Sequence, residues 1–412
     1  MSKQFRCLIF LVLYHALSFA QDNTVDYFVK QALLNSPLLQ DYQNQTLSNS
    51  IDSQKIRAAL LPQVNAVTNS VYAPVFGNVG YDGAITNGAN ISSVVGVNKR
   101  FIGKKNLQYQ FQTIDLSTKA IQNTAAISRQ ELIKTVTAQY ITTYGDLEQY
   151  RFSKDIQQLL NKEDTILKKL TQSNVYKQTD YLTFLVTLQQ QRIATSQAEI
   201  LFNKDLYALN YLCGITDTQV IELQKPDIVL VRLPNAEQSI FYRKFLLDSL
   251  ALRNQKITLD FIYKPRLNIF ADAGYVSSLL SLPLRNFGTS FGFNLTVPIY
   301  DGHQRKLEYR RLDIAQQTNT NYQQFFSRQY RQQISMLGIQ LHSTQELIGQ
   351  INTQIKYAEG LIEVNNKLLV TGDVRIADLV IALNNYLNAK NLLTQSTVNN
   401  LQLINELNYW NR

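Results

Sequence analysis

The chain has 412 residues, of which 17% are charged, and a formal net charge of +9 at pH 7. Gly and Pro are scarce, with 16 and 8 residues, and this composition favours long helices over many compact turns. No nucleophile–base motif, phosphate-binding Gly-rich loop or metal-ligand spacing is present, so the sequence argues against an enzyme, a metal centre and a bound cofactor.

The N-terminus has the pattern of a secretory signal peptide over residues 1–20. Lys3 and Arg6 precede a short apolar stretch, and Ser18 and Ala20 supply small residues before the expected cleavage point. The apolar stretch is too short to span a bilayer. We therefore expect export and removal of this segment, and export argues against a nucleic-acid partner.

The first half of the chain, residues 21–213, is predicted to be a structural repeat of helices and strands. The expected elements are a helical stretch at 27–61, strands at about 63–73 and 91–102, and a long helical hairpin at about 104–212. A Gly-rich loop at 74–90 separates the two strands. At 1.5 Å per residue, the first helix of the hairpin would extend roughly 100 Å.

The second half, residues 236–412, repeats this order after a linker at 214–235. The expected elements are a helical stretch at 239–263, strands at about 266–277 and 289–300, and a long hairpin at about 303–411. Landmarks such as Pro62 and Pro265 recur at an offset of ~200 residues, which indicates a duplication. In the linker we expect a short strand or an extended segment.

The strands of the second half alternate strictly between apolar and polar residues. Phe291, Phe293 and Leu295 share one face, and Asn294 lies on the other. This alternation is typical of a strand with lipid on one side and water on the other. Four strands cannot close a barrel, so several chains would have to share one. In the first half, Lys99 interrupts the apolar face of the strand at 91–102. Taken singly, each of these segments fits a half-buried strand of a soluble β-sandwich equally well.

Apolar residues step by three and four along the long helix of the second half. They are Leu337, Leu341, Ile348, Ile351, Ile355, Ala358, Ile362 and Leu369, with Thr344 and Asn365 in the gaps. This seam of about five heptads predicts supercoiled packing against neighbouring helices. Because a simple coiled coil would show the same seam, a periplasmic or surface coiled-coil structural or adaptor protein remains the alternative.

The doubled arrangement, the strand-to-helix junction at 297–302 and the segment from Gly372 through Asp378 to Ala382 resemble the TolC-like outer membrane efflux protein family. The resemblance covers nearly all of the chain after residue 20. It implies an α+β membrane protein whose duplicated strand-and-long-helix repeats form a trimeric 12-stranded β-barrel, with four strands per chain. A periplasmic α-helical barrel would continue this β-barrel.

The resemblance also implies a function. Members of the family are outer membrane channels, or exit ducts, of tripartite efflux or type I secretion systems. They conduct substrates passively from a periplasmic adaptor (membrane fusion) protein and an inner-membrane transporter to the exterior. The expected partners of this chain are therefore two further copies of itself, such an adaptor and transporter, and outer membrane lipid.

By the same resemblance, the functional residues lie at the periplasmic tip, where each hairpin turns. They are Asn174, Lys177, Asp180, Gly372, Asp373, Arg375 and Asp378. Asp378 matches a ring carboxylate of the family, whereas Ile381, which has no carboxylate, stands at the second ring position. Three Asp378 carboxylates would concentrate cations, and Lys177 or Arg375 would link neighbouring helices. Alternatively, Asp180 and Asp378 lie in a first helical turn because the helix dipole favours anions there.

A basic cluster stands where the second strand meets the long helix of the first half. Lys99 and Arg100 come before the junction, and Lys104 and Lys105 come after it. The cluster fits contact with lipid headgroup phosphates, and it fits a solvated junction equally well.

Overall fold

The computed structural model describes residues 23–74, 76–82, 89–217, 219–231, 235–278 and 285–411. The predicted signal peptide and parts of the two loops between paired strands lie outside the described residues. The chain divides into two compact units. Unit 1 comprises residues 1–40, 126–240 and 327–412, and unit 2 comprises residues 41–125 and 241–326.

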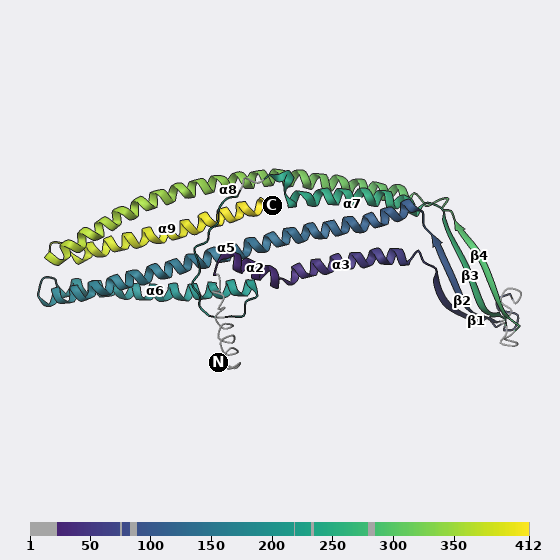
Figure 1. Ribbon diagram of the computed structural model, residues 1–412, viewed down its shortest axis with the longest axis horizontal. Coiled ribbons are helices and arrows are strands. Elements are labelled where there is room, and N and C mark those ends of the chain that lie inside the picture. The colour runs from purple at the N-terminus through teal and green to yellow at the C-terminus, as the bar shows by residue number, and fades with distance from the viewer. Residues whose placement is uncertain are drawn as a thin grey trace, which may run out of the picture. The chain divides into compact units, whose positions relative to one another are not determined.

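The helices and strands follow the order expected from the sequence (Figure 1). They are α2 (Val25–Asn35), α3 (Pro37–Ala58), β1 (Gln63–Tyr72), β2 (Ala89–Phe101), α5 (Lys104–Gln172), α6 (Gln178–Cys213), the 3-10 helix η1 (Ala236–Gln238), α7 (Ile240–Ile262), β3 (Arg266–Ser277), β4 (Phe287–Thr296), α8 (Gln304–Thr371) and α9 (Ile376–Trp410). The mostly helical fold with four strands is confirmed. The two long helices have 69 and 68 residues.

Two details differ from the sequence-based expectation. The helical stretch expected at 27–61 is two helices, because Pro37 disfavours helical backbone at Ser36, which is extended and ends α2. The strand expected to reach residue 300 ends at Thr296, shortly before Pro298, which has no N–H for a strand ladder. For the linker a short strand or an extended segment was expected, and its described residues contain no strand.

Unit 2 contains one antiparallel sheet in the order β1-β2-β3-β4. Val97 lies opposite Ala271, and Ala271 lies opposite Phe291, so odd-numbered residues of β3 and β4 share a face. That face carries Val95, Val97, Leu267, Ile269, Ala271, Phe291, Phe293 and Leu295. The other face carries Asn65, Asn98, Asn268, Asp272, Ser290 and Asn294, together with the apolar Val67, Val94, Phe270 and Val276. The apolar face is open in the single chain, with Phe291 89% exposed. Lys99 does lie on this face, opposite Ile269.

Short helices pack along the long ones within unit 2. Asn49 of α3 donates to the hydroxyl of Thr118 on α5 at 3.0 Å. Lys256 of α7 forms an ion pair of 2.7 Å with Asp313 on α8. In each repeat, the helix that precedes the strands therefore packs against the first part of the long helix.

Within unit 1 the return helices pack along the remaining parts of α5 and α8. The predicted seam on α8 is buried, since Leu337 packs with Leu403 and Leu407, and Ile355 packs with Ala389. The polar members of the seam, Thr344 and Asn365, are buried as well. The packing of α8 against α9 thus confirms the heptad seam.

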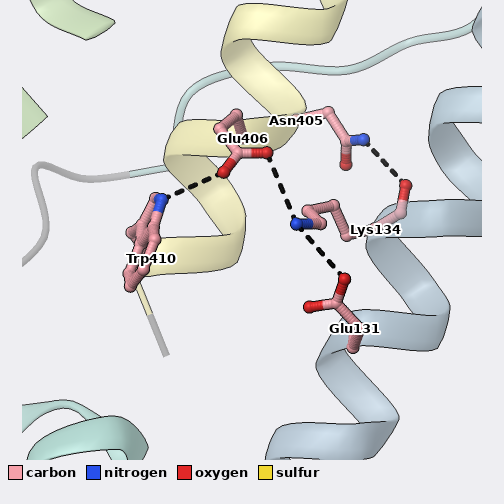
Figure 2. Close-up of polar contacts among 5 residues, drawn as sticks. All are labelled: Glu131, Lys134, Asn405, Glu406 and Trp410. Carbon is pink, nitrogen blue, oxygen red and sulfur yellow. Dashed lines mark hydrogen bonds and ion pairs between the residues drawn. The ribbon is translucent and has the colours of Figure 1, made fainter. Parts of the chain in front are cut away.

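Polar contacts join the two repeats within unit 1 (Figure 2). Lys134 of α5 forms ion pairs with Glu131, at 3.3 Å, and with Glu406 of α9, at 3.6 Å. Asn405 donates to the main-chain oxygen of Lys134 at 2.9 Å, and the indole of Trp410 donates to Glu406 at 3.1 Å. These contacts hold α9 against α5.

Within the described part of the chain, no helix combines the length and the apolar character needed to cross a bilayer.

Candidate functional site: the paired helical turns

Both long helices end in the same type of turn. Asn174 follows α5 with a φ of 59°, and Gly372 follows α8 with a φ of 80°. The next residues, Val175 and Asp373, donate from their N–H groups to main-chain oxygens five residues earlier, at 2.9 and 3.1 Å. This six-to-one bond after a left-handed residue is the Schellman motif, which satisfies carbonyl groups at a helix end. The duplicated sequence therefore gives a duplicated turn.

Each turn then leads into its return helix through a basic and an acidic residue. Lys177 precedes α6 and Arg375 precedes α9, and both have extended backbone at the N-cap. Asp180 and Asp378 follow three residues later, in the first turn of their helices. Negative charge is favourable at this position because the helix dipole places partial positive charge at the N-terminus.

The two turns differ in how these charges are paired. The guanidinium group of Arg375 donates to both carboxylate oxygens of Asp378, at 2.9 and 3.0 Å. These hydrogen bonds and the charge of Arg375 lower the pKa of Asp378. Lys177 and Asp180 are both exposed, and no ion pair within the described residues joins them. Among the described residues, an ion pair within a turn is therefore present in the second repeat and not in the first.

The two turns lie against each other inside unit 1. The hydroxyl of Tyr176 is 2.9 Å from the main-chain oxygen of Leu369 and 3.0 Å from that of Val374. Gly372 faces Val175 so closely that a Cβ added to the glycine would lie 3.0 Å from a Val175 methyl group. The tip therefore forms one joined structure in the single chain.

An apolar cluster packs all four helix ends together next to the turns. It contains Ile156, Leu160, Leu167, Phe184, Leu188, Leu369, Ile376, Leu379 and Leu383. Leu167, Phe184 and Leu379 are fully buried. Since these side chains come from α5, α6, α8 and α9, the cluster gives the exposed polar residues a packed base.

The structure brings all seven residues predicted from the sequence to this pair of turns. Sequence reasoning missed Tyr176, which makes the contacts between the turns. A signal was available, because Tyr176 and Val374 each stand one residue before an N-cap. At that position an apolar side chain commonly packs against the helix that follows. Both residues border the apolar cluster of the tip.

Solved structures with the same fold include three membrane proteins. CusC, whose structures concern folding and transmembrane channel formation, matches with a TM-score of 0.76 and 13% identity, over 94% of this chain and 92% of that chain. VceC, an outer membrane protein of Vibrio cholerae, matches with a TM-score of 0.75 and 13% identity, over 94% and 96%. The open MtrE outer membrane channel of Neisseria gonorrhoeae matches with a TM-score of 0.73 and 11% identity, over 94% and 88%.

At these identities the likeness establishes the fold. The TolC-like arrangement inferred from the sequence is therefore confirmed at that level. No protein-family model matches the sequence, and no curated protein matches it.

Proposed function

We propose that this chain is an outer membrane channel, the passive exit duct of a tripartite efflux or type I secretion system. The observation that carries the proposal is the sheet of unit 2, which has one exposed, mainly apolar face and a second face that carries most of its polar residues. Such a sheet suits a position between lipid and water. The fold shared with the VceC outer membrane protein and the MtrE outer membrane channel supports the same location.

The edges of the sheet support assembly of several chains. In the described part of the chain, β1 and β4 each pair with one strand only. In lipid, each unsatisfied main-chain group at such an edge would cost several kcal/mol. Pairing of β1 with β4 of the next copy removes these edges, and three copies would give a 12-stranded β-barrel.

A stripe on α6 supports the same assembly. Val186, Ile193, Ile200 and Tyr207 recur every seven residues and are 58%, 51%, 68% and 45% exposed. Apolar side chains at this interval are the pattern by which one helix packs against another. In the proposed homotrimer a helix of the neighbouring copy covers the stripe, and the helices form an α-helical barrel in the periplasm.

The tip would form the periplasmic entrance of the duct. At the two turns the carboxylates of Asp180, Asp373 and Asp378 outnumber the cations Lys177 and Arg375 by one, so a threefold arrangement would give a negative rim that concentrates cations. Lys177 has no partner carboxylate in its own turn, so it is available to a neighbouring copy. Arg375 would have to leave Asp378 to make such a link. A periplasmic adaptor and an inner-membrane transporter would dock at this end and supply the energy.

Recordings from planar lipid bilayers test the proposal. The purified protein should produce discrete conductance steps, and substitutions at the tip, such as Arg375→Gln, should change their size. The matched control is Arg192→Gln, because Arg192 is an exposed arginine on α6, in the hairpin of the first repeat, whose guanidinium group donates to Asn161 within that hairpin. Absence of discrete steps in membranes that contain the folded protein would contradict a channel.

A further inference from the structure

A pocket with a strongly cationic lining lies in unit 2, where α5 and α7 adjoin the ends of β2 and β3. Its volume is about 330 Å³. The charged side chains in its lining are Arg100, Lys104, Lys105, Lys264 and Arg266. In the described part of the chain, the lining includes no carboxylate, and none of the five cations forms an ion pair. The pocket therefore holds an uncompensated positive charge.

The carboxylate nearest in sequence to Lys264 is already engaged. Asp260 lies near the end of α7, four residues before Lys264, whose charge contributes to lowering the pKa of Asp260. Its carboxylate accepts hydrogen bonds from Arg305 and Tyr309, which belong to α8. Asp260 is therefore bound to α8 of the second repeat and is not a counter-ion for the cationic pocket.

The corresponding junction of the second repeat contains its own anion. The carboxylate of Asp301 accepts the N–H of His303 at 3.0 Å and the N–H of Arg305 at 2.9 Å, at the start of α8. These main-chain hydrogen bonds lower the pKa of Asp301. In the first repeat the same positions before the helix hold Phe101 and Ile102, which have no carboxylate. The duplication thus keeps the cations at both junctions and the anion at only one.

The start of α5 adds further positive charge to the pocket. Lys104 and Lys105 are the first two residues of this helix, and its first turn contains no acidic residue. The helix dipole places partial positive charge there, and the first N–H groups have no partner within the helix. Two lysines at this position are unfavourable unless an anion binds.

We propose that this pocket binds the phosphate group of an anionic phospholipid. Lysine and arginine side chains together with helix N–H groups are a donor set suited to phosphate. Phe101 favours a lipid as the source of the phosphate. It lines the pocket, is 47% exposed, and lies on the apolar face of the sheet, opposite Leu267. The lipid source rests on the proposed membrane location, whereas phosphate binding itself does not.

Binding to soluble ligands tests this site directly. The full chain, purified in an uncharged detergent, is titrated with short-chain phosphatidylglycerol, with phosphatidylcholine of the same chain length, and with inorganic phosphate. We expect phosphatidylglycerol to bind at least about tenfold more tightly than the other two, because only it combines a net negative phosphate with acyl chains.

Two matched pairs of variants locate the binding. K104Q/K105Q should weaken phosphatidylglycerol binding by about tenfold or more, whereas K168Q/K169Q, an exposed lysine pair further along α5, should leave it unchanged. Gly103→Asp should also abolish binding, because it places a carboxylate at the N-cap of α5. Gly103→Ser caps the helix without charge and should bind normally. Both side chains fit, since a Cβ at Gly103 would meet no atom within 4 Å.

Unchanged binding in K104Q/K105Q or in Gly103→Asp would overturn the site. Equal affinity for inorganic phosphate and phosphatidylglycerol would overturn the lipid source. The proposed channel fails separately, because ligand binding in detergent requires no conductance. If the protein binds phosphatidylglycerol through this pocket but forms no conducting channel, the lipid site stands and the proposed function fails. If it conducts but does not bind phosphatidylglycerol through this pocket, the proposed function stands and the lipid site fails.

Discussion

The hydroxyl of Tyr176, in the turn of the first repeat, lies 2.9 Å from the main-chain oxygen of Leu369, at the end of the long helix of the second. The two residues are 193 positions apart in the sequence. Because this contact joins the turns of both hairpins in one chain, displacement of one turn should displace the other as well.

Tyr176→Phe should loosen the tip without unfolding the protein. The substitution leaves the ring in place and removes one hydrogen bond, which is worth about 0.5–1.5 kcal/mol. Amide hydrogen exchange should become faster in both turns. Tyr181→Phe is the control, since its hydroxyl contacts Asp164 within one hairpin and its effect should stay in that hairpin. Unchanged exchange in the second turn of the Tyr176 variant would refute the coupling.

Alkaline pH should weaken the same contact. Burial, and to a lesser degree the charge of Asp373, raise the pKa of Tyr176. The folded state therefore holds the phenolic proton more tightly than the unfolded chain does. The resulting stability is complete below the ordinary tyrosine pKa near 10 and is lost as pH rises through the folded value. Tyr176→Phe should remove this part of the alkaline loss, as measured by denaturation at several pH values.

Gly372→Ala should destabilise the second turn by about 1–2 kcal/mol, because alanine pays a steric cost at a φ of 80°. The new Cβ would also press against Val175. The first turn offers the matched control, since Asn174 has the same left-handed backbone. Asn174→Gly should change the free energy of unfolding by no more than about 0.5 kcal/mol. Equal denaturation midpoints for Gly372→Ala and the unchanged chain would contradict this account.

The long helices and the alternating strands could be predicted from the sequence because each produces a short-range periodicity of apolar residues. The α8 seam around Leu337 and Ile355 and the Phe291–Leu295 face of β4 follow from it directly. The break at Ser36 depended on one proline inside an otherwise helical stretch. The contact of Tyr176 with the second turn could not be derived from spacing, because it depends on how two segments 193 residues apart pack together.

The cationic pocket shows a similar limit of sequence reasoning. The sequence identified Lys104 and Lys105 next to Arg100, but it left their role undecided between lipid phosphate and solvent. Only the folded chain adds Lys264 and Arg266 from the other repeat to the same pocket. The pairing of charges at the tip was equally hidden, because Arg375 was expected to reach a neighbouring helix, whereas it binds Asp378 in its own turn.

Asp378→Asn should weaken the cation selectivity of single channels, since it removes one negative charge per chain from the proposed entrance. Reversal potentials in a salt gradient measure this effect. Asp52→Asn is the control, because Asp52 is paired with Lys55 on α3 and lies outside the turns. Unchanged selectivity, together with unchanged block by multivalent cations, would refute the ring assignment.

Arg375→Gln should shift the pH dependence of that selectivity. Arg375 lowers the pKa of Asp378, so the carboxylate keeps its charge as pH falls below its ordinary pKa. Without the guanidinium group, the pKa should rise towards the ordinary value, and selectivity should decline at a higher pH than in the unchanged chain. Identical pH profiles for the two proteins would show that the pair does not control this charge.

Asp146→Asn should stabilise the protein near neutral pH. Burial, followed by hydrogen bonding to Asp205 and its charge, raises the pKa of Asp146 to about 7. Because the folded state binds this proton more tightly than the unfolded chain, stability falls as pH rises from about 4 to 7. Asparagine should remove this fall. At pH 8 the free energy of unfolding should therefore rise by an amount on the order of 1–2 kcal/mol, after allowance for partial solvent exposure. Asp155→Asn, an exposed site on the same helix, should retain the fall in chemical denaturation.

The native mass of protein extracted with detergent from isolated outer membranes tests the shared-barrel assembly most directly. The account predicts a complex of three chains, each slightly smaller than the 47.2 kDa of the full sequence if residues 1–20 are cleaved as the sequence predicts. A single chain, or recovery from the periplasm without detergent, would contradict it. In that case the apolar face of the sheet would not lie in a membrane.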